Sequence, residues 1–210
     1  MRTIIIKKTL YTFDELSKEA KQQAIDTRIQ ELNEDSHEEY FKSIINTKLD
    51  ELNIEAGFTI DTSDVWYDLS YCQGSGVSFT TNTPIDMEQV LDYYSKQHVT
   101  NAKEVEGIKK DSNYQYVKEN FEFTMVRIAY NYAHEYTVTC NYSDESYEAT
   151  DKQEELAEKI SKIVNEVKNI ICRKIYDELD TEYMYMISDE AIEEFFLLNG
   201  VEFTADGIEW

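Results

Sequence analysis

Proline, glycine and cysteine are scarce in this sequence of 210 residues. Proline occurs once, glycine six times and cysteine three times. These counts exclude collagen-like chains, low-complexity chains and small scaffolds that depend on disulfide bonds. The three cysteines, Cys72, Cys140 and Cys172, form no Cys-x-x-Cys motif. We therefore expect reduced thiols in a cytoplasmic protein rather than a disulfide framework.

Long apolar runs are also missing. No segment approaches the roughly 18 apolar residues that a membrane-spanning helix requires. Near the start, Thr3–Ile6 is too short for the apolar core of a signal peptide, and no small-residue cleavage site follows it. The sequence predicts no membrane binding, and we expect the protein in the cytoplasm.

Basic residues are outnumbered two to one. The chain carries 20 Lys and Arg against 43 Asp and Glu, a net charge of -23 at pH 7. Such a chain repels phosphate and anionic lipid, so we expect no direct binding to nucleic acid and a basic protein or ribonucleoprotein as partner. The imbalance grows toward the C-terminus, because 11 acids and no base follow Lys174. The alternative without a specific function is that the acidity only keeps the protein soluble.

The sequence does contain enough apolar material for a core. Hydrophobic residues make up 41% and charged residues 30%, which is typical of a globular chain rather than an acidic disordered tail. We expect a single domain over residues 1–210. Its parts are a strand with a helical hairpin (1–56), a β-rich core (57–143) and an acidic helical region (144–210).

Start signals predict two helices in the first part, after a short strand over Thr3–Ile6. Capping boxes lie at Thr12–Glu15 and Ser36–Glu39. Apolar residues recur at helical spacing after each box, and Gly57 ends the second helix. This pattern is typical of two helices that pack as a hairpin.

The middle part alternates apolar and polar residues, as strands do. Val65–Tyr71 is predicted to pair with Val77–Thr81, and Phe121–Tyr130 with Tyr136–Tyr142, as two hairpins. Between the hairpins we expect a helix near residues 86–97 and a loop over residues 101–113.

The C-terminal third reads as helical. An apolar stripe runs from Leu156 to Ile171 and weakens at Lys174, and Ser188 starts another helix that Gly200 ends. The residues after Gly200 predict a small hairpin around Asp206-Gly207. Together the patterns predict an α+β fold, with a central antiparallel sheet of two hairpins covered by amphipathic helices. Its helical C-terminal third ends in the small hairpin.

The turn Tyr71–Phe79 is the most individual segment. Cys72 could act there as a nucleophile with His134 as its base, or the two glycines of the turn could cradle a ligand. We prefer a hairpin turn with a buried structural cysteine, because the neighbouring acid Asp68 would raise the pKa of the thiol. The three histidines lack ligand spacing, so we expect no metal, no cofactor and no catalytic residue.

Two acidic groups in the C-terminal third are candidates for partner binding. The first lies opposite the apolar stripe of the long helix, and the second lies where bases are missing. The first group consists of Asp151, Glu154, Glu155 and Glu158, and the second of Glu182, Glu190, Glu193 and Glu194. Tyrosines lie among the acids of the second group, and tyrosine beside carboxylate suits the Arg and Lys side chains of a partner.

Five segments carry a resemblance to known proteins. They are Leu10–Ala24, Tyr71–Phe79, Ile175–Tyr183, Ser188–Ala191 and Glu202–Gly207. In this order they resemble a group of small acidic bacteriophage proteins that usually have no assigned function, although Ser75 stands where that group often has Asp. The resemblance implies a phage origin and synthesis inside a bacterial cell. It implies no activity and no catalytic residue.

Charge and resemblance lead to the hypothesis of a phage inhibitor of a host defence complex that processes nucleic acid, such as a CRISPR effector or a restriction enzyme. Carboxylates on a rigid surface reproduce the field of phosphates and can occupy a basic groove. One alternative is an accessory or regulatory protein that binds a host protein without mimicry. A second alternative is a Cys-dependent enzyme or small-ligand site at Cys72–Phe79. The oligomeric state is left open.

Overall fold

The computed structural model describes residues 8–144, 146 and 148–210. The strand expected over Thr3–Ile6 lies outside the described residues. Contacts divide the chain into two compact units. Unit 1 consists of the chain up to Glu38 together with Asp180–Trp210, and unit 2 consists of Glu39–Leu179. The single domain over residues 1–210 stays a prediction.

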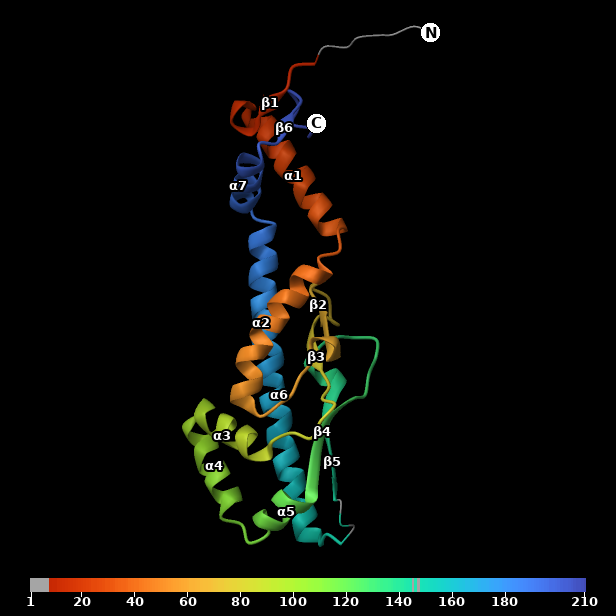
Figure 1. Ribbon diagram of the computed structural model, residues 1–210, viewed down its shortest axis with the longest axis vertical. Helices are drawn as coiled ribbons and strands as arrows, with labels where there is room; N and C mark the ends of the chain where they lie inside the picture. Colours follow the sequence, from red (N-terminus) through yellow and green to blue (C-terminus); the bar gives the residue numbers. More distant parts are fainter. Residues whose placement is uncertain (1–7, 145, 147) are drawn as a thin grey trace. The chain divides into compact units, whose positions relative to one another are not determined.

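Unit 1 brings the two ends of the described chain together (Figure 1). Near its start and its end, two short strands pair antiparallel, with Tyr11 opposite Phe203. The expected terminal hairpin is confirmed, because the Thr204 N–H donates to the Ile208 carbonyl at 2.9 Å. The elements of unit 1 are β1 (Tyr11–Thr12), a 3-10 helix (Phe13–Glu15), α1 (Lys18–Glu34), the end of α6 (Asp151–Met186), α7 (Asp189–Asn199) and β6 (Glu202–Phe203).

Three phenylalanine rings form the centre of the unit 1 core. Phe196 of α7 lies 5.3 Å from Phe13 and 5.0 Å from Phe203, measured between ring centroids. The turn of the terminal hairpin packs directly on α1, because a Cβ at Gly207 would overlap the carbonyl of Ala20. Glycine is required at that position for a second reason, since its φ of +83° is left-handed.

Unit 2 contains two confirmed hairpins. In the first hairpin Val65 pairs with Phe79, and in the second Phe121 pairs with Asp144. Among the described residues each hairpin is its own two-stranded sheet, and side chains such as Thr81, whose Oγ1 accepts from the Met125 N–H, join them. The elements are α2 (Glu38–Ala56), β2 (Val65–Asp68), β3 (Gly76–Phe79), α3 (Met87–Gln97), α4 (Val99–Lys109), α5 (Tyr114–Asn120), β4 (Phe121–Arg127), β5 (Val138–Asp144) and most of α6.

The loop expected over residues 101–113 is wrong. Most of this stretch is α4, which lies beside α3 as a helical hairpin (Figure 1). The side chain of His98 caps α4 by accepting from the Thr100 N–H, and Val105 and Ile108 are buried. Two buried residues on one face were too few for a periodic signal, yet packing against α3 is enough to hold the helix.

The apolar stripe of α6 packs against the other elements of unit 2. Asn165 accepts a hydrogen bond from the Cys140 N–H of β5 at 2.9 Å, and Glu178 pairs with Lys48 of α2 at 3.2 Å. The helix does not change at Lys174, because that side chain is exposed and donates to the hydroxyl of Tyr93. The structure is thus α+β with a helical C-terminal region, as the sequence predicts. Its two hairpins form separate small antiparallel sheets rather than one central sheet.

Candidate functional site

Helix α7 presents an exposed face that combines acids with leucines. Its buried side faces the core through Ile192 and Phe196. The opposite face follows the spacing i, i+3, i+4, i+7 and i+8, so its members are neighbours on the helix surface. The members of this face, named the α7 surface, are Glu190, Glu193, Glu194, Leu197 and Leu198. Leu198 is 78% exposed, so this end of the surface is apolar and open to solvent.

Both ends of α7 are fixed by capping groups that the sequence signals. The Ser188 hydroxyl accepts a hydrogen bond from the Ala191 N–H, which satisfies one backbone donor of the first turn. Gly200 ends the helix with a left-handed φ of +61°. The α7 surface is therefore held on a rigid element rather than on a loop.

The carboxylates of the α7 surface are not paired with a base in the part of the chain that the structure describes. Glu190, Glu193 and Glu194 form no ion pair with any other described residue. Arg28 pairs with Glu31 at 3.0 Å and its guanidinium lies 4.8 Å from the Phe195 ring, and Lys8 Nζ lies 3.9 Å from the Trp210 ring. The surface thus combines unpaired negative charge with exposed apolar side chains.

The remaining predicted acid of the tail lies in a different setting. Glu182 belongs to α6 and is half-buried, whereas the three acids of α7 are exposed. It also takes part in interactions within the protein. Glu182 is therefore a weaker candidate for partner binding than the acids of α7.

The acids predicted on the first half of α6 share their surface with lysines. Asp151, Glu154, Glu155 and Glu158 are all exposed and follow the spacing of one helix face. Lys152, Lys159 and Lys162 are exposed on the same stretch. Lys162 pairs with Glu158 at 2.8 Å, and its hydrogen bond lowers the pKa of that carboxyl. This stretch is of mixed charge and does not resemble a row of phosphates.

The cysteine of the Tyr71–Phe79 turn is exposed, so the expectation of a buried Cys72 is wrong. Its sulfur accepts hydrogen bonds from the Ser70 hydroxyl at 3.2 Å, the Gly74 N–H at 3.4 Å and the Ser75 hydroxyl at 3.6 Å. These donors lower the pKa of the thiol, most of all through Ser70, and outweigh the opposing charge of Asp68. The expectation that Asp68 would dominate is therefore wrong as well.

The base proposed for Cys72 is engaged elsewhere. The Nδ1 atom of His134 accepts a hydrogen bond from the Tyr136 N–H at 3.3 Å, and its ring stacks on Tyr132 at 5.7 Å. Among the described residues no hydrogen bond joins His134 to Cys72. The nucleophile and base of a Cys–His enzyme are thus not assembled in this structure.

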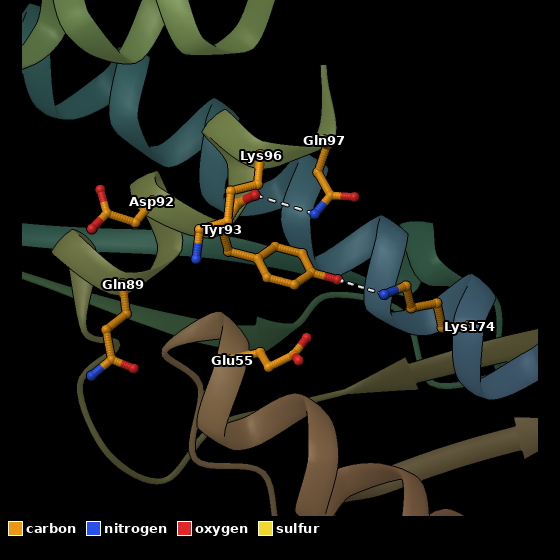
Figure 2. A pocket seen from close by; sticks show the side chains of 7 residues that line it. All are labelled: Glu55, Gln89, Asp92, Tyr93, Lys96, Gln97 and Lys174. Atoms are coloured by element: carbon orange, nitrogen blue, oxygen red, sulfur yellow. Dashed lines mark hydrogen bonds between the residues drawn. The ribbon is translucent and has the colours of Figure 1, made fainter. Parts of the chain in front are cut away.

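Pockets of unit 2 lie beside Cys72 and between three of its helices. One, of about 390 Å³, opens beside Cys72 and Tyr71 and is also lined by Glu135 and Arg173. The other, of about 410 Å³, lies between α2, α3 and α6. Figure 2 shows that polar side chains of both charge signs line this second pocket, with Lys174 donating to the Tyr93 hydroxyl at 2.9 Å. Neither pocket gathers a catalytic set.

The sequence reading missed a buried lysine. Lys168 is 2% exposed and donates to the carbonyls of Glu135 at 2.5 Å and Val138 at 2.7 Å. Burial lowers the pKa of this ammonium group. Its position inside the apolar stripe of α6 was the signal that could have found it. Lys168 ties α6 to the segment that leads into β5.

The remaining thiols, the possible metal ligands and the helices can be considered in turn. Burial raises the pKa of both Cys140 and Cys172 to about 12. Within the described ranges, no group of three or more His, Cys, Asp or Glu side chains is placed to hold a metal ion. In the same ranges, every helix is too short or too polar to cross a membrane.

The chain belongs to a family described as a domain of unknown function (DUF8835), whose model matches residues 35–189. The match contains all of unit 2 and ends at Asp189, the first residue of α7. No curated protein and no solved structure matches the chain.

Proposed function

We propose that the protein is an acidic binding protein that docks its α7 surface onto a basic surface of another protein. The specific proposal is that the partner is a host defence complex that processes nucleic acid, such as a CRISPR effector or a restriction enzyme. Docking of the α7 surface then inhibits this complex. The observation that carries the proposal is the α7 surface itself. Its three unpaired carboxylates lie beside two exposed leucines on a rigid helix.

The two kinds of side chain contribute different parts of binding. Carboxylates facing a basic groove steer the encounter and exclude acidic partners. Exposed leucines supply an apolar contact that loses water on binding, which adds affinity in proportion to the apolar area buried. The combination favours a protein partner, because nucleic acid would be repelled by the net charge of -23.

The geometry supports occupation of part of a groove rather than imitation of a whole duplex. With a rise of about 1.5 Å per residue, Glu190 and Glu194 lie about 6 Å apart along the axis and bracket Glu193. B-DNA carries one charge per roughly 1.7 Å, so the α7 surface has about half that density over one helical turn. Leu197 and Leu198 then interrupt the charge.

The leucines favour one alternative function. A regulator that binds a host protein away from its nucleic-acid groove would use the same apolar contact and would need fewer charges. Excess DNA distinguishes the two, because it competes with an inhibitor that occupies the groove and leaves the other kind of complex intact.

The test is inhibition of DNA cleavage by a set of purified CRISPR effectors and restriction enzymes. We expect the parent protein to inhibit at least one of them, with relief by excess DNA. The variant Glu193→Lys/Glu194→Lys should raise the half-inhibitory concentration about ten-fold or more, since several charges act together. The matched control Glu34→Lys/Asp35→Lys makes the same charge change at the C-terminal end of α1 and should change the half-inhibitory concentration less than about three-fold.

Circular dichroism checks that both variants keep the helical content of the parent. If no enzyme of the set is inhibited, the inhibitor form of the proposal is wrong. If both variants lose inhibition equally, net charge matters and the α7 surface does not.

A further inference from the structure

The pocket between α2, α3 and α6, named the α3 pocket, brings together charged groups of both signs. Its volume of about 410 Å³ lies in the range of small-molecule sites. It is lined by one acid of α2, Glu55, and by two bases, Lys96 of α3 and Lys174 of α6. A second acid of the lining, Asp92, is paired with Lys109 of α4 at 2.5 Å. We propose that the α3 pocket binds an acidic amino acid, whose two carboxylates and one ammonium group complement the two lysines and the one unpaired acid.

The end of α2 and the start of α3 are fixed against each other beside the pocket. The Asp86 N–H donates to the Gly57 carbonyl at 2.9 Å. Gly57 has a left-handed φ of +74°, and a Cβ there would lie 2.7 Å from both the Asp86 carbonyl oxygen and Gln89 Cβ. Glycine therefore allows the close approach that places Glu55 and Gln89 in one pocket lining.

A buried tyrosine holds one of the two ammonium groups in position. Tyr93 is 4% exposed, and its hydroxyl accepts a hydrogen bond from Lys174 Nζ at 2.9 Å. Figure 2 shows Glu55 and Lys174 extending from α2 and α6 toward the Tyr93 ring. The hydrogen bond orders Lys174 before a ligand arrives, which reduces the entropy that binding loses. The ring offers an apolar contact to the methylene groups of a ligand.

Two glutamines add hydrogen-bonding groups to the lining. Gln89 Nε2 donates to the Asp86 carboxylate at 2.9 Å, and Gln97 Nε2 donates to the Tyr93 carbonyl at 3.2 Å. These bonds fix both amide groups on α3. Within the described residues each Oε1 atom accepts no hydrogen bond, so both oxygens are available to the ammonium group of a ligand.

The charges of the pocket are not neutralised by the protein itself. Glu55 and Lys96 form no ion pair with any residue in the described ranges, and Lys174 donates there to a neutral hydroxyl. The nearby acid Glu178 of α6 pairs instead with Lys48 of α2 at 3.2 Å. Two bases and one acid therefore face the pocket without an oppositely charged partner, although the whole chain carries a net charge of -23.

This pattern of charge distinguishes an acidic amino acid from other small ligands. A phosphate compound suits the two lysines but is repelled by Glu55, and a polyamine suits Glu55 but is repelled by the lysines. A neutral amino acid has one carboxylate and leaves the second lysine without a partner. An acidic amino acid supplies an oppositely charged group for each of the three side chains.

Isothermal titration calorimetry with L-glutamate tests the proposal, with glutarate and 4-aminobutyrate for comparison. Glutarate lacks the ammonium group, and 4-aminobutyrate lacks one carboxylate. We expect the parent to bind L-glutamate with a Kd on the order of 1 mM or below. Each comparison compound should bind at least about five-fold more weakly, because it leaves one charge of the pocket unpaired.

Single substitutions assign the three charges. Glu55→Gln should weaken binding of L-glutamate about five-fold without weakening binding of glutarate, since glutarate has no ammonium group. Lys96→Gln should weaken binding of both compounds about five-fold. The matched controls Glu51→Gln on α2 and Lys103→Gln on α4 make the same changes outside the pocket lining and should alter each affinity less than about two-fold.

Three results overturn the proposal. The first is absence of binding by the parent up to about 10 mM L-glutamate. The second is tighter binding of glutarate or inorganic phosphate than of L-glutamate, with a further gain in Glu55→Gln, which would make the pocket a site for anions alone. The third is an equal loss of L-glutamate binding in the controls and in the pocket variants, since net charge would then account for the effect.

Discussion

Unit 1 and unit 2 are both acidic, but they hold their acids differently. Unit 1 has 17 acids and 6 bases, while unit 2 is about twice as long and has 26 acids and 14 bases. In unit 2 lysines pair with many of the acids, as Lys118 does with Glu88 and Lys162 with Glu158. Among the described residues of unit 1, Lys8, Lys21 and Arg28 lie over aromatic rings and Arg28 also pairs with Glu31, while the α7 carboxylates form no ion pair.

Net charge alone therefore does not locate a binding surface, because both units are acidic. Exposed ion pairs contribute little to stability and leave a mixed surface. Carboxylates without partners repel one another, which costs stability. The family model matches all of unit 2 and ends at Asp189, where α7 begins. The acids and leucines of the α7 surface therefore lie outside the matched residues.

The largest effect is expected on the buried side of α7. Phe196→Ala removes the ring at the centre of the unit 1 core and should lower the free energy of unfolding by about 3–5 kcal/mol. Leu198→Ala on the exposed side of the same helix should change it by less than about 0.5 kcal/mol. Denaturant unfolding followed by circular dichroism measures both. A similar loss in the two variants would show that the α7 surface is part of a core.

The three thiols should differ strongly in reactivity. Cys72 is exposed with a lowered pKa, whereas burial raises the pKa of Cys140 and Cys172 to about 12. At pH 8 the native protein should react with Ellman's reagent at one thiol, at least about 100-fold faster than at the other two. Ser70→Ala removes the main donor to the sulfur and should slow that reaction. If all three thiols reacted at one rate in the folded protein, the burial of Cys140 and Cys172 would be contradicted.

A smaller effect is expected from Lys168. Its pKa in the folded protein is lowered by burial, so the unfolded chain binds more protons between the folded and the unfolded pKa values. The free energy of unfolding of the parent should therefore rise with pH in that window, relative to Lys168→Met. Urea unfolding of both proteins from pH 7 to pH 10.5 measures the difference. A difference that falls with pH would mean that the ammonium group is stabilised rather than penalised by its site.

Local signals in the sequence predicted much of the fold. The capping box at Thr12–Glu15, the N-cap Ser188 and the C-terminal Gly200 all act where expected, because each depends on residues within one turn. The alternation in both hairpins gave the correct partners for the same reason. Helix α4 was missed because its stability comes from α3 rather than from its own pattern.

The candidate surfaces were harder to predict, because they depend on residues far apart in the sequence. The acids of α7 are exposed and remain a prediction for partner binding, whereas the lysines beside Asp151–Glu158 weaken the other group. The pKa of Cys72 depends on the orientation of Ser70 and Ser75, which periodicity does not reveal. The contact between the two hairpin loops of unit 2, where the Ala133 N–H donates to the Gly74 carbonyl, also joins residues far apart in the sequence.

The most direct test of the account compares equal charge reversals in the two units. Glu193→Lys/Glu194→Lys changes the α7 surface, and Glu154→Lys/Glu155→Lys changes the mixed face of α6 by the same number of charges. With an enzyme that the parent inhibits, we expect the first variant to weaken inhibition about ten-fold and the second less than about three-fold. Equal losses, or a larger loss from the α6 variant, would contradict the claim that the unpaired acids of α7 bind the partner.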